Sequence, residues 1–251
     1  MVCSIETYEE PKLNNPILIE GLPGIGFVAN IAVLFLIREL KATRFAEIHS
    51  STFQDLAVTT ETGSTRSPLN ELYYAKSKAA GRDLILWHGN TQALTTFGQY
   101  ELCGRVLNVS QDLGCRYLIS LGGFKIEEAK PVPQIFCAAT DTDTLNEALG
   151  LGTKIMVGQI FGVAGILVGL AKLKDFKGFS LLVETRGTYP DAVAAGTVLG
   201  ALSKFLNLDL NMAALEGAAE ETKRTLESFG LIKSFTQEKE KKEEQQFRWS
   251  V

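Results

Sequence analysis

The sequence predicts an α/β fold in which a mixed central sheet is covered by helices on both faces. Short apolar runs alternate with longer segments of helical pattern along most of the 251 residues, which is the order expected when helices pack on a sheet. The composition, with 45% hydrophobic and 22% charged residues, is that of an ordinary soluble globular protein. We therefore expect one α/β domain at residues 1–236, followed by a charged, flexible C-terminal tail at residues 237–251.

Apolar runs in the first half of the chain predict strands at residues 17–19, 45–49, 56–60, 71–75 and 83–88. Helical patterns follow at residues 27–40 and 97–113. Three of the predicted strands succeed one another without a helix between them, so they could form an antiparallel meander. Such a meander beside parallel strands would make the sheet mixed.

The second half of the chain predicts strands at residues 116–121, 135–139 and 180–184, and helices at residues 192–205 and 212–229. Pro190 and Asp191 precede the first of these helices, where both residue types favour a helix start. Residues 155–171 are apolar, but they contain Gln159 and four glycines and fall short of the roughly 18 to 20 apolar residues of a membrane span. We interpret them as a buried loop and helix.

The charge and the cysteines argue against several classes of protein. A formal net charge of −4 is a poor match to nucleic acid, whose partners usually present a strongly basic face. Four cysteines are scattered at positions 3, 103, 115 and 137 without a C-x-x-C pair, so neither a zinc site nor a disulfide framework is suggested. The acidic N-terminus lacks a signal pattern. We expect a cytoplasmic protein without a metal or cofactor.

A glycine turn at residues 21–26 joins the first predicted strand to the first predicted helix. Gly24 to Ala29 satisfy the dinucleotide fingerprint G-x-G-x-x-G/A, in which glycines let the backbone approach a pyrophosphate. Glu47 lies about 20 positions further on, where an acid that holds the ribose is expected. That role requires its strand to lie beside the first predicted strand. Alternatively, Gly24 and Gly26 simply allow a tight strand-to-helix joint.

Two further loops are expected to follow buried strands, the usual place for ligand loops in open α/β sheets. Gly122-Gly123 either belongs to such a loop or merely ends its strand. In a second loop, Glu184 and Arg186 could hold a sugar hydroxyl and an anion, and Asp191 could act as a general acid or base. Alternatively, Asp191 caps its helix while Glu184 pairs with Arg186. The candidate ligand residues of the three loops are Gly24, Gly26, Gly122, Gly123, Glu184, Arg186 and Asp191.

The two histidines, His49 and His88, lie in apolar, strand-like runs without an obvious nucleophile beside them in the sequence. We expect each to be a hydrogen-bonded histidine of the core or of a sheet edge. The chain contains no G-x-S-x-G, H-E-x-x-H or G-x-x-x-x-G-K-[ST] motif. We therefore predict no catalytic residue.

Four blocks, in order along the chain, resemble the proteasome assembly chaperone 2 family. They are EGLPGIGFVANIA at 20–32, LGG at 121–123, GQIFGVAGIL at 158–167 and ETRGTYPDAVAA at 184–195. The first and last blocks are specific, and the resemblance spans most of the chain. It implies a three-layer α/β/α sandwich similar to the purine nucleoside phosphorylases. It also implies homo-oligomers and, for archaeal-type members, chaperone-like binding to proteasome α subunits.

The C-terminal tail is a second candidate binding element. Residues 238–246 read EKEKKEEQQ, a solvated charged run, and the chain then ends FRWSV. For archaeal-type members, the resemblance implies a tail that ends hydrophobic-Tyr-any residue and docks between neighbouring α subunits. This chain has Ser250 where that pattern has Tyr. The candidate partner-binding residues are Phe247, Trp249 and Val251.

Besides a dinucleotide oxidoreductase, which rests on the fingerprint alone, two functions from different classes stay open on this sequence. One is a non-enzymatic, homo-oligomeric scaffold that binds proteasome α subunits or related particles and docks through its tail. The other is an enzyme or sensor for a nucleoside-like or phosphorylated small molecule, which would use the three glycine-rich and polar loops. We expect neither nucleic acid nor a membrane as a partner.

Overall fold

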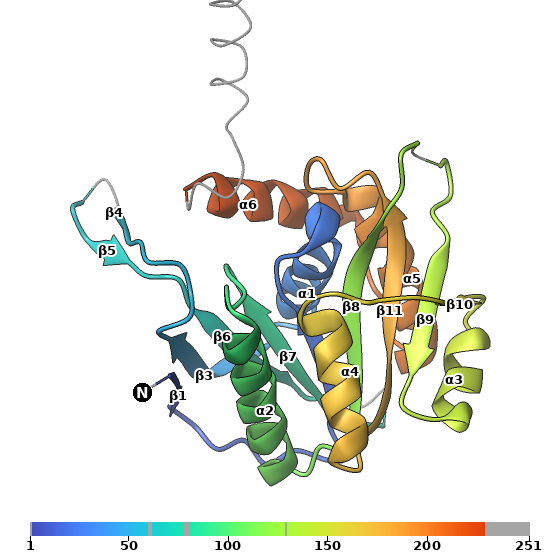
Figure 1. Ribbon diagram of the computed structural model, residues 1–251, viewed down its shortest axis with the longest axis horizontal. Coiled ribbons are helices and arrows are strands. Elements are labelled where there is room, and N and C mark those ends of the chain that lie inside the picture. Colours follow the sequence, from blue (N-terminus) through green and yellow to red (C-terminus); the bar gives the residue numbers. More distant parts are fainter. Residues whose placement is uncertain (1, 60–61, 78–80, 129, 229–251) are drawn as a thin grey trace, which may run out of the picture.

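Nine strands form one central sheet in the part of the chain that the structure describes. The computed structural model describes residues 2–59, 62–77, 81–128 and 130–228. The strand order is β1-β3-β6-β7-β2-β8-β11-β9-β10 (Figure 1). The strands are β1 (Cys3–Thr7), β2 (Ile17–Gly21), β3 (Thr43–Ser50), β6 (Asn70–Ala75), β7 (Leu84–Gly89), β8 (Tyr117–Lys125), β9 (Ile135–Ala139), β10 (Lys154–Ile155) and β11 (Lys177–Thr185).

The sheet is mixed, as the sequence predicts. Strand β2 pairs in parallel with β7 and β8, and β8 pairs in parallel with β11. The pairs β1–β3, β3–β6, β6–β7 and β11–β9 are antiparallel. Because β7, β2, β8 and β11 run in the same direction, they end at one edge of the sheet, which we call the carboxyl edge.

Helices cover both faces of this sheet and make three layers (Figure 1). One face carries α1 (Val28–Glu39), α3 (Thr142–Leu149), α5 (Ala192–Leu206) and α6 (Leu215–Ser228), with short 3-10 turns at Ile25–Phe27 before α1 and Met212–Ala214 before α6. The other face carries α2 (Thr96–Asp112) and α4 (Val163–Leu173). The α/β/α architecture is therefore confirmed, whereas the likeness to purine nucleoside phosphorylases stays a prediction.

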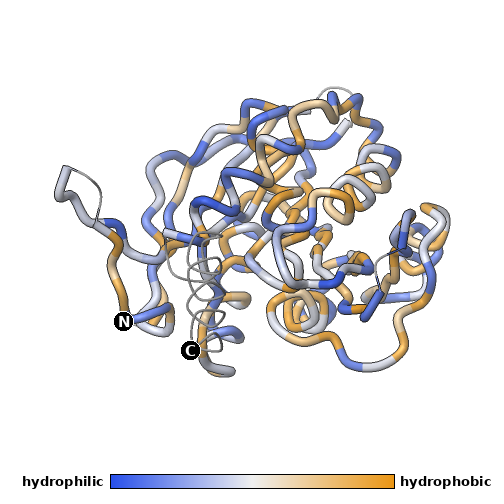
Figure 2. The backbone as a smooth tube through the Cα atoms, turned by 90° about the horizontal axis from the view of Figure 1, so that it is seen from above, coloured by the Kyte–Doolittle hydropathy of each residue, from blue (hydrophilic) through white to orange (hydrophobic). Residues whose placement is uncertain are grey.

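Two hydrophobic cores lie between the layers, and the alternation of side chains along β2 explains both. Ile17 and Ile19 belong to the core under α1 and α5, and Leu18 belongs to the core under α2 and α4. A strand covered on both faces needs apolar residues at every position, which is why β2 reads as a continuous apolar run. Hydrophobic and hydrophilic stretches alternate along the helices (Figure 2), as expected when one side of each helix faces the sheet.

One predicted strand does not belong to the sheet. Of the predicted strand at residues 56–60, the described residues 56–59 contain only the short strand β4 (Val58–Thr59), which pairs with β5 (Thr65–Arg66) in a separate ribbon. This ribbon projects away from the main sheet (Figure 1). The antiparallel part of the sheet is built instead from β1, β3, β6 and β7, because the strand at Cys3–Thr7, which was not predicted, pairs along β3.

Strand β8 is longer than predicted. It continues through Gly122-Gly123 to Lys125, paired with β11 along its whole length. The glycine pair therefore lies inside the strand and does not end it. The short helix α3 and strand β10 were also not predicted.

The apolar stretch at 155–171 is partly exposed. Helix α4 begins at Val163 and buries Leu167 and Ala171 against the sheet, but Val157 and Phe161 in the preceding loop are more than four-fifths exposed. The prediction of a buried segment is thus right for the helix and wrong for the loop. Among the described residues, no helix combines the length and the apolar character that crossing a membrane requires.

Candidate functional site

A cavity of about 400 Å³ opens at the carboxyl edge. Its walls come from the turn after β2, from β8 and β11, and from the loop that leads into α4. Its lining includes Gly24, Gly122 and Gly123, which come from two of the three predicted ligand loops. The volume is within the range of small-molecule sites in proteins. The topology therefore brings together residues about 100 positions apart in the sequence.

The glycines of this region are explained by close packing of the turn on the sheet. A Cβ on Gly123 would lie 2.1 Å from the backbone oxygen of Ile25, and a Cβ on Gly26 would lie 2.6 Å from the Thr185 hydroxyl. Gly26 also has a φ of 65°, which favours glycine. Gly24, by contrast, is extended and has only Gln92 within 4 Å of an added Cβ. The strand-to-helix joint therefore accounts for Gly26 and Gly123.

Gln92, which follows β7, holds the turn and helix α4 together. Its side-chain amide donates to the Pro23 carbonyl. Its Oε1 accepts from the Val163 N–H at the start of α4, at 3.4 Å. One side chain thus fixes two walls of the cavity.

Glu20 is the buried carboxylate in the wall of the cavity, and sequence reasoning did not select it. Its side chain is fully buried. The Leu22 N–H donates to its Oε1 and the Ser120 hydroxyl donates to its Oε2, each at 2.7 Å. Burial raises the pKa of Glu20 to about 7, although these hydrogen bonds favour the ionised form. A lone acid in an otherwise apolar strand, ILIEG, was the signal that could have found it.

The third predicted loop lies beside this cavity. Glu184 accepts from the Lys130 ammonium at 2.6 Å and from the Gln134 N–H at 3.0 Å. Burial favours a higher pKa for Glu184, but its bonds to Lys130 and Gln134 outweigh burial and hold the pKa below its usual value. Glu184 thus pairs with Lys130 instead of the predicted Arg186, which is exposed.

Asp191 caps helix α5, which is one of the two roles that the sequence leaves open for it. Its Oδ1 accepts from the Ala194 N–H at 2.9 Å, and its Oδ2 accepts from the Thr185 hydroxyl at 2.7 Å. Its own N–H donates to the Gly26 carbonyl at 2.9 Å. Asp191 therefore ties α5 to β11 and to the glycine turn. The cavity lining does not include Gly26, Glu184, Arg186 or Asp191.

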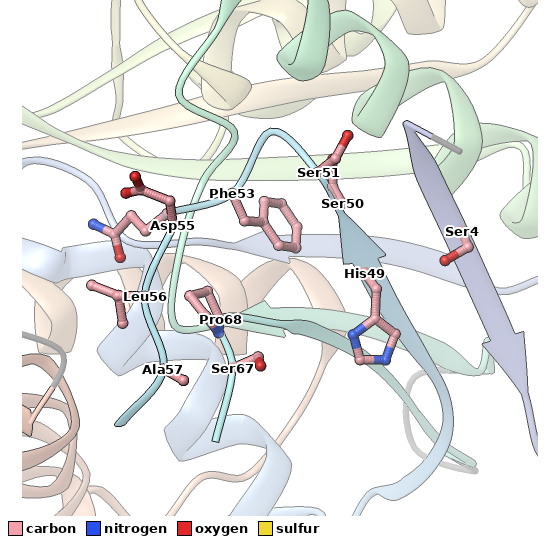
Figure 3. Close-up of a pocket in the computed structure, with 11 residues that line it drawn as sticks. Ser4, His49, Ser50, Ser51, Phe53, Asp55, Leu56, Ala57, Ser67 and Pro68 are labelled. Atoms are coloured by element: carbon pink, nitrogen blue, oxygen red, sulfur yellow. The ribbon is translucent and has the colours of Figure 1, made fainter. Parts of the chain in front are cut away.

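A second pocket, of about 480 Å³, lies where β3 leaves the sheet towards β4 (Figure 3). It gathers His49 and four serines, a combination that could suggest a nucleophile and its base. However, the His49 ring points away from Ser50 and Ser51 (Figure 3). Among the described residues, His49 has an ion pair with Glu47 at 3.5 Å and no hydrogen bond to these serines. The lining is mostly polar and exposed, so the carboxyl-edge cavity is the better candidate site.

The remaining candidates of the sequence are structural. His88 on β7 is partly buried, and burial of its ring, followed by the charge of Arg38, lowers its pKa to about 4. Its Nε2 has no hydrogen-bond partner among the described atoms, so it is a neutral core histidine. Strands β6 and β7 separate β3 from β2, so Glu47 cannot reach a ribose at the glycine turn and the dinucleotide hypothesis is wrong. Phe247, Trp249, Val251 and the whole tail lie outside the described residues.

Comparison with known proteins identifies relatives along almost the whole chain. The family model described as PAC2 matches residues 18–229. An uncharacterized protein of Methanocaldococcus jannaschii is 30% identical over 228 residues, which cover 90% of this chain and 86% of that protein. The crystal structure of Pyrococcus furiosus PbaB, described as an archaeal proteasome activator, superposes with a TM-score of 0.81 at 36% identity and covers 91% of this chain and 99% of that chain. Pyrococcus furiosus PbaA, described as an archaeal homolog of proteasome-assembly chaperone, has a TM-score of 0.73 at 27% identity, over 89% of this chain and 94% of that chain.

Proposed function

This chain belongs to the PAC2 family, and on that premise we propose that it is a non-enzymatic, homo-oligomeric scaffold that binds proteasome α subunits. One observation carries the proposal: 36% identity and a TM-score of 0.81 with a protein described as an archaeal proteasome activator. The similarity to PbaA, described as a homolog of proteasome-assembly chaperone, supports the same class of partner. The proposal places the protein in the cytoplasm with its α-subunit partner.

The polar residues around the carboxyl edge support a binding role over a catalytic one. Asp191 has both carboxylate oxygens engaged in the cap of α5 and in its bond from Thr185. Glu184 is engaged by Lys130 and by a backbone N–H. Groups held in this way stabilise the fold, and a general acid or base must instead face a substrate.

Exposed apolar side chains at the same edge support contact with other protein chains. Ile25 and Phe161 line the carboxyl-edge cavity, and Leu94 lines a neighbouring pocket that shares Gly24 and Gln92 with it. Leu94 is 64% exposed and Phe161 is 82% exposed. Single exposed apolar residues are ordinary, whereas a group of them is typical of interaction surfaces.

The tail is the proposed docking element. Phe247, Trp249 and Val251 are apolar residues beyond a charged run, EKEKKEEQQ. Several tails on one oligomer would raise the effective concentration of each docking event, so individually weak anchors would give firm capture.

We test the proposal by capture of purified archaeal proteasome α subunits on the immobilised full chain. The intact chain should capture them, and a variant that lacks residues 247–251 should capture at least about tenfold less, given the size of avidity effects. The substitution Ser250→Tyr restores the hydrophobic-Tyr-any ending and should strengthen capture if the tail docks in that mode. No capture by the intact chain would refute the proposal, while equal capture by the truncated chain would refute only the role of the tail.

A further inference from the structure

We propose that the carboxyl-edge cavity binds a small apolar amine, with the Glu20 carboxylate as the counter-ion of its ammonium group. This inference goes beyond the proposed scaffold function and does not depend on it. It rests on the shape of the cavity and on the chemistry of one buried side chain.

The cavity has the form of a small-molecule site. About 400 Å³ of space lies between the sheet and α4. Apolar side chains supply much of its wall, among them Leu22, Phe124, Ile160 and Leu182. Sites of this size usually combine an apolar lining with a few well-placed polar groups that orient the ligand. A compact hydrocarbon body fits such a lining.

Glu20 is the polar group that would orient the ligand. Its carboxylate accepts from the Leu22 N–H at Oε1 and from the Ser120 hydroxyl at Oε2, and the Leu121 N–H is a third donor to it. A carboxylate has about four acceptor positions, so roughly one of them remains for a donor from the cavity. Among the described residues, no lysine, arginine or histidine forms an ion pair with Glu20. Because a buried charge needs a partner, a ligand ammonium group would supply what the protein does not.

The titratable neighbours of Glu20 do not supply that charge either. The thiol of Cys103 faces it from α2, and burial, followed by the charge of Glu20, raises the pKa of this thiol. Lys125 lines the cavity but is exposed. His88 lies one residue beyond Trp87, the register partner of Glu20, so it belongs to the opposite face of the sheet. Amine binding therefore depends on the ionised form of Glu20 itself.

The same carboxylate argues against a phosphorylated ligand. An ionised Glu20 would repel a phosphate group placed in the apolar part of the cavity. Of the ligand classes that the sequence suggested, the structure thus disfavours the phosphorylated one.

The test uses cyclohexylmethylamine as the probe and cyclohexylmethanol as its uncharged isostere. Binding to the full chain is measured by calorimetry at pH 6 and pH 8. Burial places the pKa of Glu20 at about 7, so the ionised fraction rises about tenfold between these two pH values, and the apparent affinity for the amine should rise by about the same factor. The alcohol should bind more weakly and without this pH dependence.

Two variants separate a real site from a general effect on the fold. Glu20→Gln keeps the shape of the side chain and should lose both amine binding and its pH dependence. Ala164→Met extends a side chain into the cavity from α4 while Glu20 stays intact, and it should also abolish binding. Its control, Gly169→Met, adds the same side chain to α4 at an exposed position where nothing lies within 4 Å of the added Cβ, and binding should persist.

Absence of binding to the intact chain at 10 mM amine, as a rough limit for specific sites, would overturn the proposal. Equal affinities at pH 6 and pH 8, or unchanged binding by Glu20→Gln, would also overturn it.

Discussion

Glu20 is the next-to-last residue of β2, a strand that is buried at every position. Its carboxyl group keeps hydrogen bonds from Leu22, Ser120 and Leu121 there, but it has lost nearly all contact with water. Burial disfavours the charged form, which raises the pKa from 4.5 to about 7. Between pH 4.5 and 7, Glu20 therefore holds a proton in the native chain that it has released in the unfolded chain.

This shift predicts a measurable effect of pH on stability. The native state binds more protons than the unfolded state between pH 4.5 and 7, so the contribution of Glu20 to stability is greatest below pH 4.5 and declines as pH rises towards 7. The full decline corresponds to about 3 kcal/mol. Glu20→Gln should remove this component. Urea unfolding of the unaltered chain and of Glu20→Gln is measured from pH 4.5 to 8. The unfolding free energy of the unaltered chain should fall relative to that of the variant until about pH 7, and the difference should then stay constant. Parallel curves would contradict the burial argument.

A second residue-scale prediction concerns Gly123. An added Cβ would lie 2.1 Å from the Ile25 backbone oxygen, so Gly123→Ala must push the glycine turn away from β8. We expect a loss of unfolding free energy of about 1–3 kcal/mol, as in other overpacked sites, measured by urea denaturation. Gly104→Ala is the control, since Gly104 lies in α2 with nothing within 4 Å of an added Cβ. That variant should gain about 0.5–1 kcal/mol of stability. If Gly123→Ala and Gly104→Ala change the unfolding free energy equally, the turn can move away from β8 without a loss of stability.

At the scale of elements, Asp191 links three segments. It caps α5, accepts from Thr185 on β11 and donates its N–H to Gly26 in the glycine turn. Asp191→Ala should therefore lower the unfolding free energy by about 1–2 kcal/mol, the usual effect of a lost cap. Asp191→Asn should lose much less, because an amide oxygen also caps a helix. Thermal unfolding of the two variants tests this. If both are equally destabilised, the negative charge of Asp191 stabilises the contact between α5, β11 and the glycine turn, and its hydrogen bond at the helix cap does not.

The order of elements could be predicted from the sequence because it follows from local patterns. Helices α1, α2 and α5 and strands β2, β7 and β9 all lie within a few residues of their predicted positions. The exceptions depend on distant partners. Strand β1 is half exposed, and its place at the sheet edge depends on pairing with β3 about 40 residues away. Residues 56–60 have a strand-like composition, but among the described residues Val58 and Thr59 pair with β5 and stay outside the sheet.

The candidate site was predicted only in part, for the same reason. Gly24, Gly122 and Gly123 meet at one cavity because parallel strands end at a common edge, which is a rule of topology. The partner of Glu184 is Lys130, 54 residues earlier in the chain, and nothing local distinguishes it from Arg186. The raised pKa of Glu20 depends on its burial under the layer of α2 and α4. That burial follows from tertiary packing, which local sequence patterns do not give.

At the scale of the whole molecule, three packed layers leave apolar side chains exposed at the carboxyl edge. Ile25, Leu94 and Phe161 come from three loops that the fold brings to this edge. In a homo-oligomer such a surface would be covered by another copy of the chain. The apolar residues of several tails would then lie on one particle. Avidity would make capture of α subunits depend on oligomerisation.

This reasoning predicts that oligomerisation and α-subunit capture are lost together. Leu94→Asp places a charge on an apolar surface without entering the cavity lining, so light scattering should show a smaller particle. Its tail is unchanged, yet capture of proteasome α subunits should fall at least about tenfold, because single tails lack avidity. Leu173→Asp is the control, since Leu173 is 80% exposed at the far end of α4, and it should keep both the particle size and the capture. If Leu94→Asp keeps its particle size, the carboxyl edge is not the surface through which the copies meet. If the particle dissociates while capture persists, a single tail is sufficient for docking and avidity has no part in it.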